Sequence, residues 1–333
     1  MTGSEKDILL SQEYQLAMKL ESIFMPHARR QRDQLYVEDA DPRFVHYTSA
    51  ENALNILKGK RLWMRPTVCM SDYREVQHGF DILAKFFSDK LRMETFCKAL
   101  DESAAGAAQE AINLFNGWWE TIRFHTYISS ISEHASKEDF HGRLSMWRAF
   151  GQSTARVAIV FKILRVTESA RALNLMFSPV AYLTEVEVHD IMNDVINNMK
   201  TEAEFLRSVP HKVIVQTVYQ MLLAAVTCLK HEGFREEREW RAIYSPRIIP
   251  SPLMESSVEV VGGVPQIIHK IPLDVKVSPA LADLDLAQMF DRLIIGASPY
   301  PLPIAEAFIE ILKKAGVSDA EKRVFVSGIP IRS

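Results

Sequence analysis

The chain has 333 residues, and its 39 Lys and Arg residues nearly balance its 42 Asp and Glu residues, which gives a formal net charge of −3 at pH 7. Apolar residues make up 47% and charged residues 24% of the chain, proportions that exclude a disordered or collagen-like protein. The charge balance also argues against a strongly basic nucleic-acid binder, although it leaves room for a local basic groove. At about 150 residues per domain, the length allows two domains or one large domain with insertions.

Cysteine content and apolar segments bear on the cellular compartment. The three cysteines (Cys69, Cys97 and Cys228) form no CxxC pair, which argues against a zinc ribbon or a redox dithiol, and their odd number fits a reducing compartment. The opening residues MTGSEKDILL lack the basic and apolar regions of a secretory signal. The most apolar expected helix, Val213–Leu229, is shorter than the roughly 20 residues that span a bilayer. We therefore expect a cytoplasmic protein without a membrane segment or a bound metal.

The first expected elements are an N-terminal helix over residues 5–32 and a compact unit of strand, helix and strand. Phe44–Tyr47 has the pattern of a short strand, and Thr48-Ser49-Ala50-Glu51 is a capping-box signature for the helix that follows. Residues 61–65 then predict a second strand before Pro66.

The rest of the chain alternates between helical and strand patterns. Helices are predicted over 68–100 (opened by Ser71 or Asp72), 103–120, 184–209, 210–231 and 304–315, with a short helical turn at 144–150. Strands are predicted over 126–132, 157–162, 238–244, 267–271, 292–295 and 323–326, and loops over 134–143 and 246–265. We expect an α+β fold with a mixed β-sheet core. A helical segment, 1–40, precedes one domain, 41–333, which carries a helical insertion at about 184–231.

Several common catalytic signatures are missing from the sequence. It contains no GxGxxG, Walker loop, HExxH, GxSxG or kinase motif, which argues against a Rossmann dehydrogenase, a P-loop NTPase, a zincin or an α/β-hydrolase. What remains is a scatter of polar residues at the ends of the predicted strands.

Two of these polar residues lie on the first predicted strand. His46 and Thr48 share one face of it and Tyr47 points to the other. His46 can hydrogen-bond a ribose hydroxyl or an amide. In the structural alternative, Thr48 is a helix N-cap and His46 is a satisfied, half-buried histidine.

Trp147 and Arg148 lie beside a turn in the run from Asp139 to Phe150. An indole can stack on a heteroaromatic ring, and a guanidinium can contact a phosphate with two hydrogen bonds. Composition alone favours the alternative of a core tryptophan beside a surface salt bridge.

The segment Glu236–Arg241 concentrates charge. If the strand begins near Glu237, then Glu237, Glu239 and Arg241 share one face. Such a cluster can stabilise a developing oxocarbenium ion of the kind met in glycosidic bond cleavage. The alternative is an ion-pair ladder on an exposed edge.

Several segments together resemble a large bacterial family of uncharacterised domains. They are FVHYTSAENALNILKGKRLWM (44–64), MSDYREVQHGF (70–80), TYISSISEHASKEDFHGRLSMWRAFG (126–151), FREEREWRAIY (234–244) and LIIGASPYP with VFVSGIPIR (293–332). The opening unit also resembles the start of the ADP-ribosyltransferase fold, in which a strand carrying a His and a Thr enters a capped helix.

That resemblance implies a site for NAD, bound as a substrate in a cleft between two halves of the sheet. It places His46 and Thr48 at the adenosine ribose and the nicotinamide amide. Glu239, or else Glu237, becomes the catalytic carboxylate that orients the nicotinamide ribose. His46, Glu239 and Trp147 are then expected to line one cleft.

The resemblance also suggests how the rest of the dinucleotide is held. Tyr47 or Trp147 stacks on the nicotinamide ring. Arg61, Arg65 or Arg148, or else a helix N-terminus, neutralises the pyrophosphate.

The function implied is NAD-dependent ADP-ribosyl transfer to a macromolecular acceptor, either protein or nucleic acid, by a toxin, effector or phage-defence protein. Whether a partner protein inhibits the enzyme stays open. The alternatives are an NAD glycohydrolase and a non-catalytic binding or regulatory module of the same fold.

Overall fold

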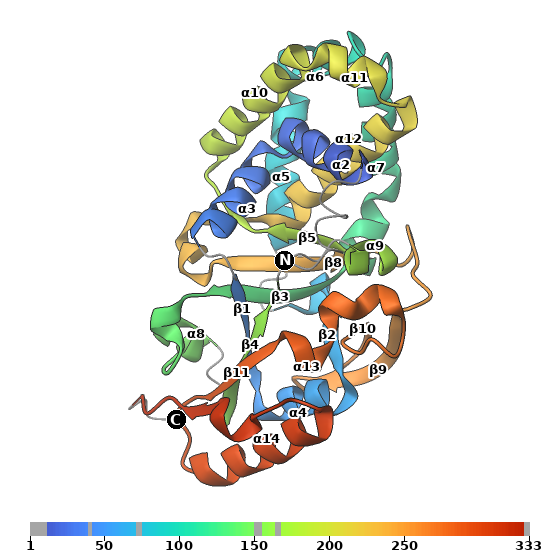
Figure 1. The fold of residues 1–333 in the computed structure, drawn as a ribbon. Coiled ribbons are helices and arrows are strands. Elements are labelled where there is room, and N and C mark those ends of the chain that lie inside the picture. Colours follow the sequence, from blue (N-terminus) through green and yellow to red (C-terminus); the bar gives the residue numbers. More distant parts are fainter. Residues whose placement is uncertain (1–11, 39–41, 71–74, 150–154, 164–167, 330–333) are drawn as a thin grey trace. The chain divides into compact units, whose positions relative to one another are not determined.

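The computed structural model describes residues 12–38, 42–70, 75–149, 155–163 and 168–329. The chain groups into two compact units, each assembled from three separate segments. The helical unit comprises 1–35, 72–123 and 179–234, and the sheet unit comprises 36–71, 124–178 and 235–333. Figure 1 shows the helices and strands of both units, which are described separately below.

The helical unit combines the N-terminal helices with those predicted over 184–231 and with the helices that follow residue 75. In it α12 packs against α5 and α2, and α10 packs against α6 and α2. Its helices are α2 (Gln12–Phe24), α3 (Pro26–Glu38), α5 (Glu75–Ser88), α6 (Lys90–Asp101), α7 (Ala107–His125), α10 (Glu185–Thr201), α11 (Ala203–Ser208) and α12 (His211–Cys228). A short parallel pair, β6 (Ala181–Tyr182) and β7 (Leu229–Lys230), completes it.

The core of the helical unit centres on α12. Most of the side chains from Ile214 to Cys228 are buried, which explains why this helix is the most apolar of the chain. Within the described residues, α12 included, no helix is long and apolar enough to cross a membrane. Gly79 of α5 lies against α12 so closely that a Cβ atom would sit 2.7 Å from the Ala225 carbonyl oxygen. The two helices therefore pack closely only because residue 79 has no side chain.

The sheet unit is built on a ten-stranded sheet. Its main path runs β12-β11-β4-β1-β3-β2-β10-β9, with β8 paired to β3 and β5 paired to β8. The strands are β1 (Arg43–Ser49), β2 (Arg61–Pro66), β3 (Tyr127–His134), β4 (Arg156–Lys162), β5 (Met176–Pro179), β8 (Glu239–Tyr244), β9 (Glu255–Val261), β10 (Val264–Pro272), β11 (Phe290–Ile295) and β12 (Val324–Val326). Because β12 runs parallel to β11 while β11, β4, β1 and β3 pair antiparallel, the predicted α+β fold with a mixed sheet is confirmed.

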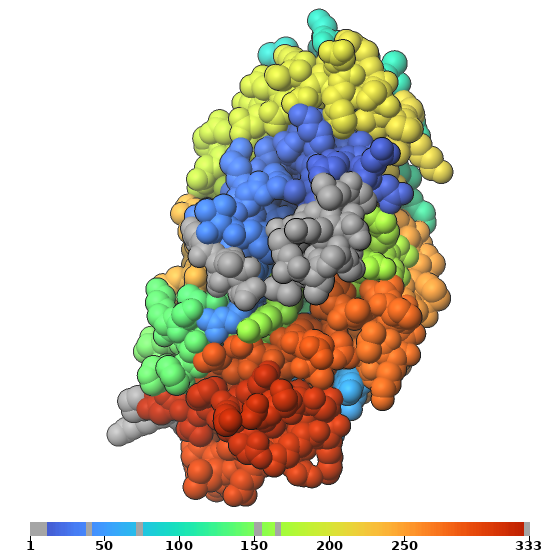
Figure 2. Space-filling view, in the orientation of Figure 1, coloured from blue at the N-terminus to red at the C-terminus, as the bar shows by residue number. Residues whose placement is uncertain are grey.

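Short helices cover the sheet of this unit. They are α4 (Ala50–Gly59), α8 (Leu144–Ala149), α9 (Glu168–Ala172), α13 (Leu286–Met289) and α14 (Pro301–Ala315), with 3-10 turns η1 (Thr67–Cys69), η2 (Ser136–Glu138), η3 (Glu232–Glu237), η4 (Pro279–Leu284) and η5 (Ala320–Lys322). Helix α14 packs on α4 and β12. The C-terminal segments form a continuous orange-to-red surface on the face shown in Figure 2.

The sheet divides at β3, and this division positions the candidate site. Ser132 pairs with Val45 of β1 on one side and with Glu239 of β8 on the other. Ile128 pairs with Arg65 of β2 on the same side as β1, and again with β8 on the other. Strand β1 therefore leaves β3 to continue on β4, and β2 leaves it to continue on β10 (Figure 1). We call the edge of β3 between these two strands the fork.

Most of the predicted elements are present, with boundaries shifted by a few residues. The strands predicted over 44–47, 61–65, 126–132, 157–162, 238–244, 267–271, 292–295 and 323–326 are confirmed, as are the helices after residue 49 and over 304–315. The helix predicted over 5–32 is wrong as one piece, because α2 ends at Phe24 and Pro26 begins α3. The helix predicted over 68–100 divides into η1, α5 and α6, and its predicted opening residues, Ser71 and Asp72, lie outside the described residues.

Two local predictions are corrected. Ser49, not Thr48, caps α4, because the Ser49 hydroxyl accepts the Asn52 backbone N–H at 3.2 Å. The surface loop predicted over 246–265 contains β9 and the start of β10, joined at Gly262 and Gly263 with φ of 60° and 80°. A two-residue hairpin with positive φ at both positions favours glycine, which explains the turn.

Replacing Gly79 with Ala is expected to lower the free energy of unfolding of the protein by about 1–3 kcal/mol, the usual cost of overpacking a tight core. The Cβ atom would meet the backbone of α12, which cannot rotate away. Urea denaturation followed by circular dichroism measures the change.

The matched control for this substitution is Gly117→Ala in α7, where an added Cβ meets nothing within 4 Å. That change should be neutral or stabilising, since alanine favours a helix by about 1 kcal/mol over glycine. Equal effects of the two substitutions would contradict the close packing of α5 on α12.

Candidate functional site

His46 of β1 lies at the fork. Its Nδ1 atom is 2.9 Å from the backbone carbonyl oxygen of Ser130, and its side chain is half-buried. Because a carbonyl oxygen only accepts, Nδ1 carries the proton and Nε2 of the neutral ring carries the lone pair. Burial lowers the pKa of His46 below its ordinary value of 6.5, against the opposing effect of the Ser130 hydrogen bond. The ring is therefore neutral at pH 7, with Nε2 as an acceptor.

Glu239 and Arg241 of β8 form a buried ion pair beside Ser130 of β3. Arg241 donates from Nε to Oε1 of Glu239 at 2.7 Å and from a terminal nitrogen to Oε2 at 3.0 Å. The Ser130 hydroxyl donates to Oε1 at 2.5 Å. Glu239 is 6% exposed and Arg241 2% exposed, so their charges compensate each other away from water.

Ser130 connects these groups. Its backbone carbonyl accepts a hydrogen bond from His46 and its hydroxyl donates one to Glu239, so both predicted residues contact Ser130 of β3 through different groups. The register places Arg241 opposite Ser130, on the same face of the sheet. His46 reaches the carbonyl at the edge of β3 instead. We call His46, Ser130, Glu239 and Arg241 the fork cluster.

The predicted stacking rings lie in the core. Trp147 is 2% exposed, packs edge to face on Tyr47 with ring centroids 4.9 Å apart, and donates from Nε1 to the His141 carbonyl at 2.6 Å. Tyr47 is 4% exposed, and its hydroxyl oxygen accepts the Arg143 backbone N–H at 2.7 Å. Burial raises the pKa of Tyr47 to about 12. Neither ring presents an open face to a ligand. Trp147 is therefore a core tryptophan, the alternative to a ring that stacks on a ligand.

Close contacts with two glycines explain the position of Trp147. A Cβ atom at Gly142 would lie 2.9 Å from the indole ring, and one at Gly296 would lie 3.0 Å from it. The ring also packs with Val45 and Ile294, among other apolar residues of β1, β4, α8 and β11. Trp147 thus anchors α8 to the sheet rather than lining an open cleft with His46 and Glu239.

The residues predicted to bind the pyrophosphate are dispersed. Arg65 of β2 lies at the fork and donates to the Gln266 side chain at 3.1 Å and to the Cys69 carbonyl at 2.6 Å. Arg61 pairs with Glu255 at 2.6 Å, and Arg148 is exposed on α8. Arg65 is the predicted arginine that shares the fork with His46.

Two further predictions concern residues flanking the fork. Thr48 is buried near the end of β1. Glu237 lies in η3, because β8 begins only at Glu239 and Arg238 takes a left-handed conformation with φ of 43°. The condition under which Glu237 and Glu239 share a strand face is therefore not met, and Glu239 is the candidate carboxylate.

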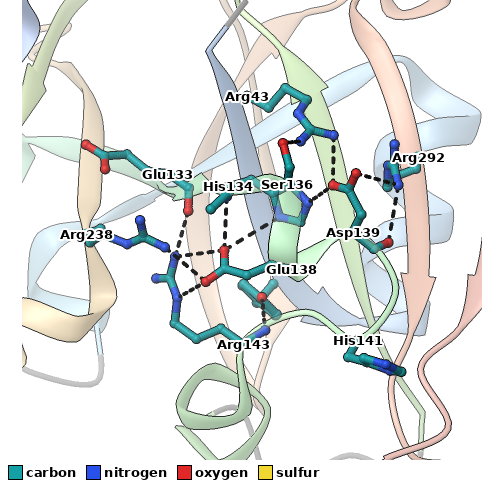
Figure 3. Close-up of polar contacts among 12 residues, drawn as sticks. Arg43, Glu133, His134, Ser136, Glu138, Asp139, His141, Arg143, Arg238 and Arg292 are labelled. Carbon is teal, nitrogen blue, oxygen red and sulfur yellow. Dashed lines mark hydrogen bonds and ion pairs between the residues drawn. The ribbon is translucent and has the colours of Figure 1, made fainter. Parts of the chain in front are cut away.

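A second polar network lies in the segment that the sequence predicts to be a loop, 134–143 (Figure 3). Glu138 accepts from Arg143 at 3.0 Å and from Arg238 at 2.9 Å. Arg143 also donates to the backbone carbonyls of Glu236 and Glu237. Burial alone would raise the pKa of Glu138, but the hydrogen bonds and charges of Arg143 and Arg238 lower it below its usual range. This network holds the segment that leads into β8.

The same network continues through His134 and Asp139. His134 Nε2 lies 3.0 Å from Asp139, and Asp139 also pairs with Arg43 at 2.8 Å and with Arg292 at 3.1 Å (Figure 3). Burial lowers the pKa of His134, although Asp139 opposes that effect. Polar residues mark this segment in the sequence, but their partners on distant strands do not follow from it.

A family model described as "Protein of unknown function (DUF2971)" matches residues 146–242. The match runs from α8 to β8 and includes Trp147 and Glu239. It supports the expected resemblance to a family of uncharacterised domains. No curated protein and no solved structure matches the chain. Among the residues that the structure describes, no group of three or more His, Cys, Asp or Glu side chains could hold a metal ion.

Replacing Arg241 with Ala is expected to lower the free energy of unfolding by about 3–5 kcal/mol, because it leaves the buried Glu239 charge without its partner. Replacing both residues together, as Glu239→Leu with Arg241→Met, removes both charges and should recover most of the loss. Urea denaturation of the two variants measures this. A double variant no more stable than Arg241→Ala would contradict the ion-pair explanation.

Stability should also depend on pH below neutrality. His46, His134 and His269 all have pKa values lowered by burial from the ordinary 6.5. Such a histidine binds fewer protons in the folded state, so its contribution is complete above 6.5 and is lost as the pH falls below it. We expect the thermal midpoint to fall between about pH 7.5 and about pH 5.5, and His134→Asn to reduce that slope. An unchanged slope in the variant would contradict the assignment of a neutral, buried His134.

Proposed function

We propose that the sheet unit transfers an ADP-ribosyl group from NAD to a macromolecular acceptor, with the fork cluster at its site. The observation that supports this proposal is that His46 and Glu239 both hydrogen-bond to Ser130, where the sheet divides. The sequence resemblance to the ADP-ribosyltransferase fold supplies the reaction.

In this reaction the glycosidic bond between the ribose C1 carbon and the nicotinamide nitrogen breaks, and nicotinamide leaves with the bonding electron pair. Positive charge develops on the ribose. The acceptor nucleophile then bonds to C1 and gives up its proton. A carboxylate near the ribose stabilises the developing charge, and a buried carboxylate does so more strongly than one in water. Glu239 is the group on β8 that suits this role.

The neighbours of Glu239 keep its carboxylate in one orientation. Ser130 and Arg241 donate three hydrogen bonds to it, so it needs little rearrangement as charge develops. His46 contributes an acceptor at Nε2, which suits a ribose hydroxyl or an amide N–H of the dinucleotide. Arg65 of β2, which pairs with β3 at the fork, offers a cation for the pyrophosphate.

A non-catalytic module of the same fold is the second candidate. The observation that favours it is the compensation of Glu239 by Arg241 in a setting where both are almost fully buried. A carboxylate held in this way can serve mainly to join β8 to β3. The two functions differ in NAD consumption, which only the transferase and the glycohydrolase alternative require.

The test is to incubate the purified full-length chain with NAD labelled in the adenylate phosphate, in the presence of cell lysate. Label that moves onto protein or nucleic acid, together with free nicotinamide, supports transfer. Release of free ADP-ribose with no labelled macromolecule supports hydrolysis. Intact NAD after long incubation supports the non-catalytic module and contradicts the proposal.

Variants assign the residues. Glu239→Gln keeps the shape of the side chain and should lower nicotinamide release by at least about a hundredfold, the scale of one removed electrostatic stabiliser. Glu306→Gln on the exposed side of α14 is the matched control and should behave as the wild type. Circular dichroism must show both variants folded.

Two further variants keep the assignment testable if Glu239→Gln unfolds. Glu237→Gln should retain activity, because Glu237 lies outside β8. His46→Asn should raise the KM for NAD while leaving the fold intact. An unchanged KM and full activity in His46→Asn, or full activity in a folded Glu239→Gln, would contradict the assignment of the fork cluster to the reaction.

A further inference from the structure

A shallow pocket of about 300 Å³ opens on the sheet unit, apart from the fork cluster. It lies where the ends of β4, β11 and β12 meet and is lined by four cationic residues and one carboxylate. We call it the basic pocket. Its lining residues are Lys162, Gln288, Phe290, Asp291, Arg292, Lys322, Arg323 and Phe325.

Positive charge exceeds negative charge in the basic pocket. Asp291 is shared, because it pairs with Arg292 at 2.8 Å, with Arg43 at 3.3 Å and with Lys162 at 3.9 Å. Arg323 donates to neutral oxygens, the Phe290 carbonyl at 2.6 Å and the Ser318 hydroxyl at 3.4 Å. Lys322 also pairs with Asp319 at 3.1 Å and Arg292 with Asp139 at 3.1 Å, so three carboxylates adjoin the four cations and a small excess of positive charge is left here.

The backbone of β11 contributes to this arrangement. The register along β4 shifts between Phe290 and Arg292, so Asp291 is an extra residue in a β-bulge. Burial alone would raise the pKa of Asp291, but the hydrogen bonds and charges of Arg292 and Arg43 lower it. Asp291 therefore stays ionised and orients the guanidinium groups of Arg292 and Arg43 through its ion pairs with them.

Aromatic rings border the cations. The Arg292 guanidinium lies 5.3 Å from the centre of the Phe325 ring. Phe140 packs edge to face on Phe325 with ring centroids 5.6 Å apart, and it is 59% exposed. Phe140 lies outside the lining of the basic pocket but contacts it through Phe325, and its exposed ring offers a flat apolar surface there.

We propose that the basic pocket and Phe140 bind single-stranded nucleic acid, with phosphates at Lys162, Lys322 and Arg323 and a base stacked on Phe140. Cations that contact successive phosphates, interleaved with exposed aromatic rings, are the general basis of single-strand binding. A phosphorylated peptide would use the cations but has no planar base for Phe140. The inference stands on this surface alone and does not require the proposed transferase activity.

The experiment measures fluorescence anisotropy of a labelled single-stranded oligouridylate with the full-length protein at low salt. We expect binding whose affinity falls as salt rises, with a slope of about 0.7 per phosphate contacted. Lys162→Glu combined with Lys322→Glu should weaken binding about tenfold or more, since both side chains are partly or largely exposed and reversal adds repulsion. The matched control, Lys276→Glu, changes an exposed lysine of the same unit outside the pocket and should bind as the wild type.

Phe140→Ala separates nucleic acid from other polyanions. It should weaken oligouridylate binding at least about fivefold, the lower range for loss of one stacked base, and leave heparin binding unchanged. The inference is overturned if the wild type does not bind, if the double lysine variant binds as the wild type, or if Phe140→Ala has no effect. A phosphoserine peptide that displaces the oligouridylate at equal concentration would assign the surface to phosphopeptides instead.

Discussion

The buried pairing of Glu239 with Arg241 is the interaction on which the candidate site depends. Both side chains rise from β8 onto the face of the sheet that carries Ser130, and the Ser130 hydroxyl completes the contacts of the carboxylate. A lone buried charge would be strongly unfavourable, so neither member of the pair is tolerated without the other. The same contacts that join β8 to β3 therefore also fix the direction of the Glu239 carboxylate.

Much of the sheet unit could be predicted because its signals are local. Alternation of apolar residues marks β3, a continuous apolar run marks β4, and the Ser49 region marks the start of α4 by its capping residues. The spacing of Glu239 and Arg241 is two residues, so their shared face follows from strand geometry alone. Strand β9 does not follow from the sequence, which predicts a loop there. Most of its side chains are exposed or half-exposed, so its local pattern is that of a polar loop.

The site itself depends on contacts that no local pattern contains. The sheet divides because β1 and β2, which are joined through α4, both pair with the same edge of β3. Val45 of β1 and Arg65 of β2 make these contacts. Trp147 is buried because Gly142 and Gly296, far apart in sequence, both leave room for its ring. In the same way Arg43, Asp139 and Arg292 come from three separate segments to form one network (Figure 3). Such pairings follow only from the complete fold.

The interleaving of the two units along the chain has a consequence for synthesis on the ribosome. β3 is translated long before β8, its partner along Tyr127–Ser132, and the whole 179–234 segment of the helical unit emerges in between. The sheet unit cannot close until β8 has been translated, so β3 keeps an open hydrogen-bonding edge until then. A nascent chain of this design is therefore exposed to aggregation for longer than one whose domains follow each other in sequence, and chaperone binding during translation would protect it.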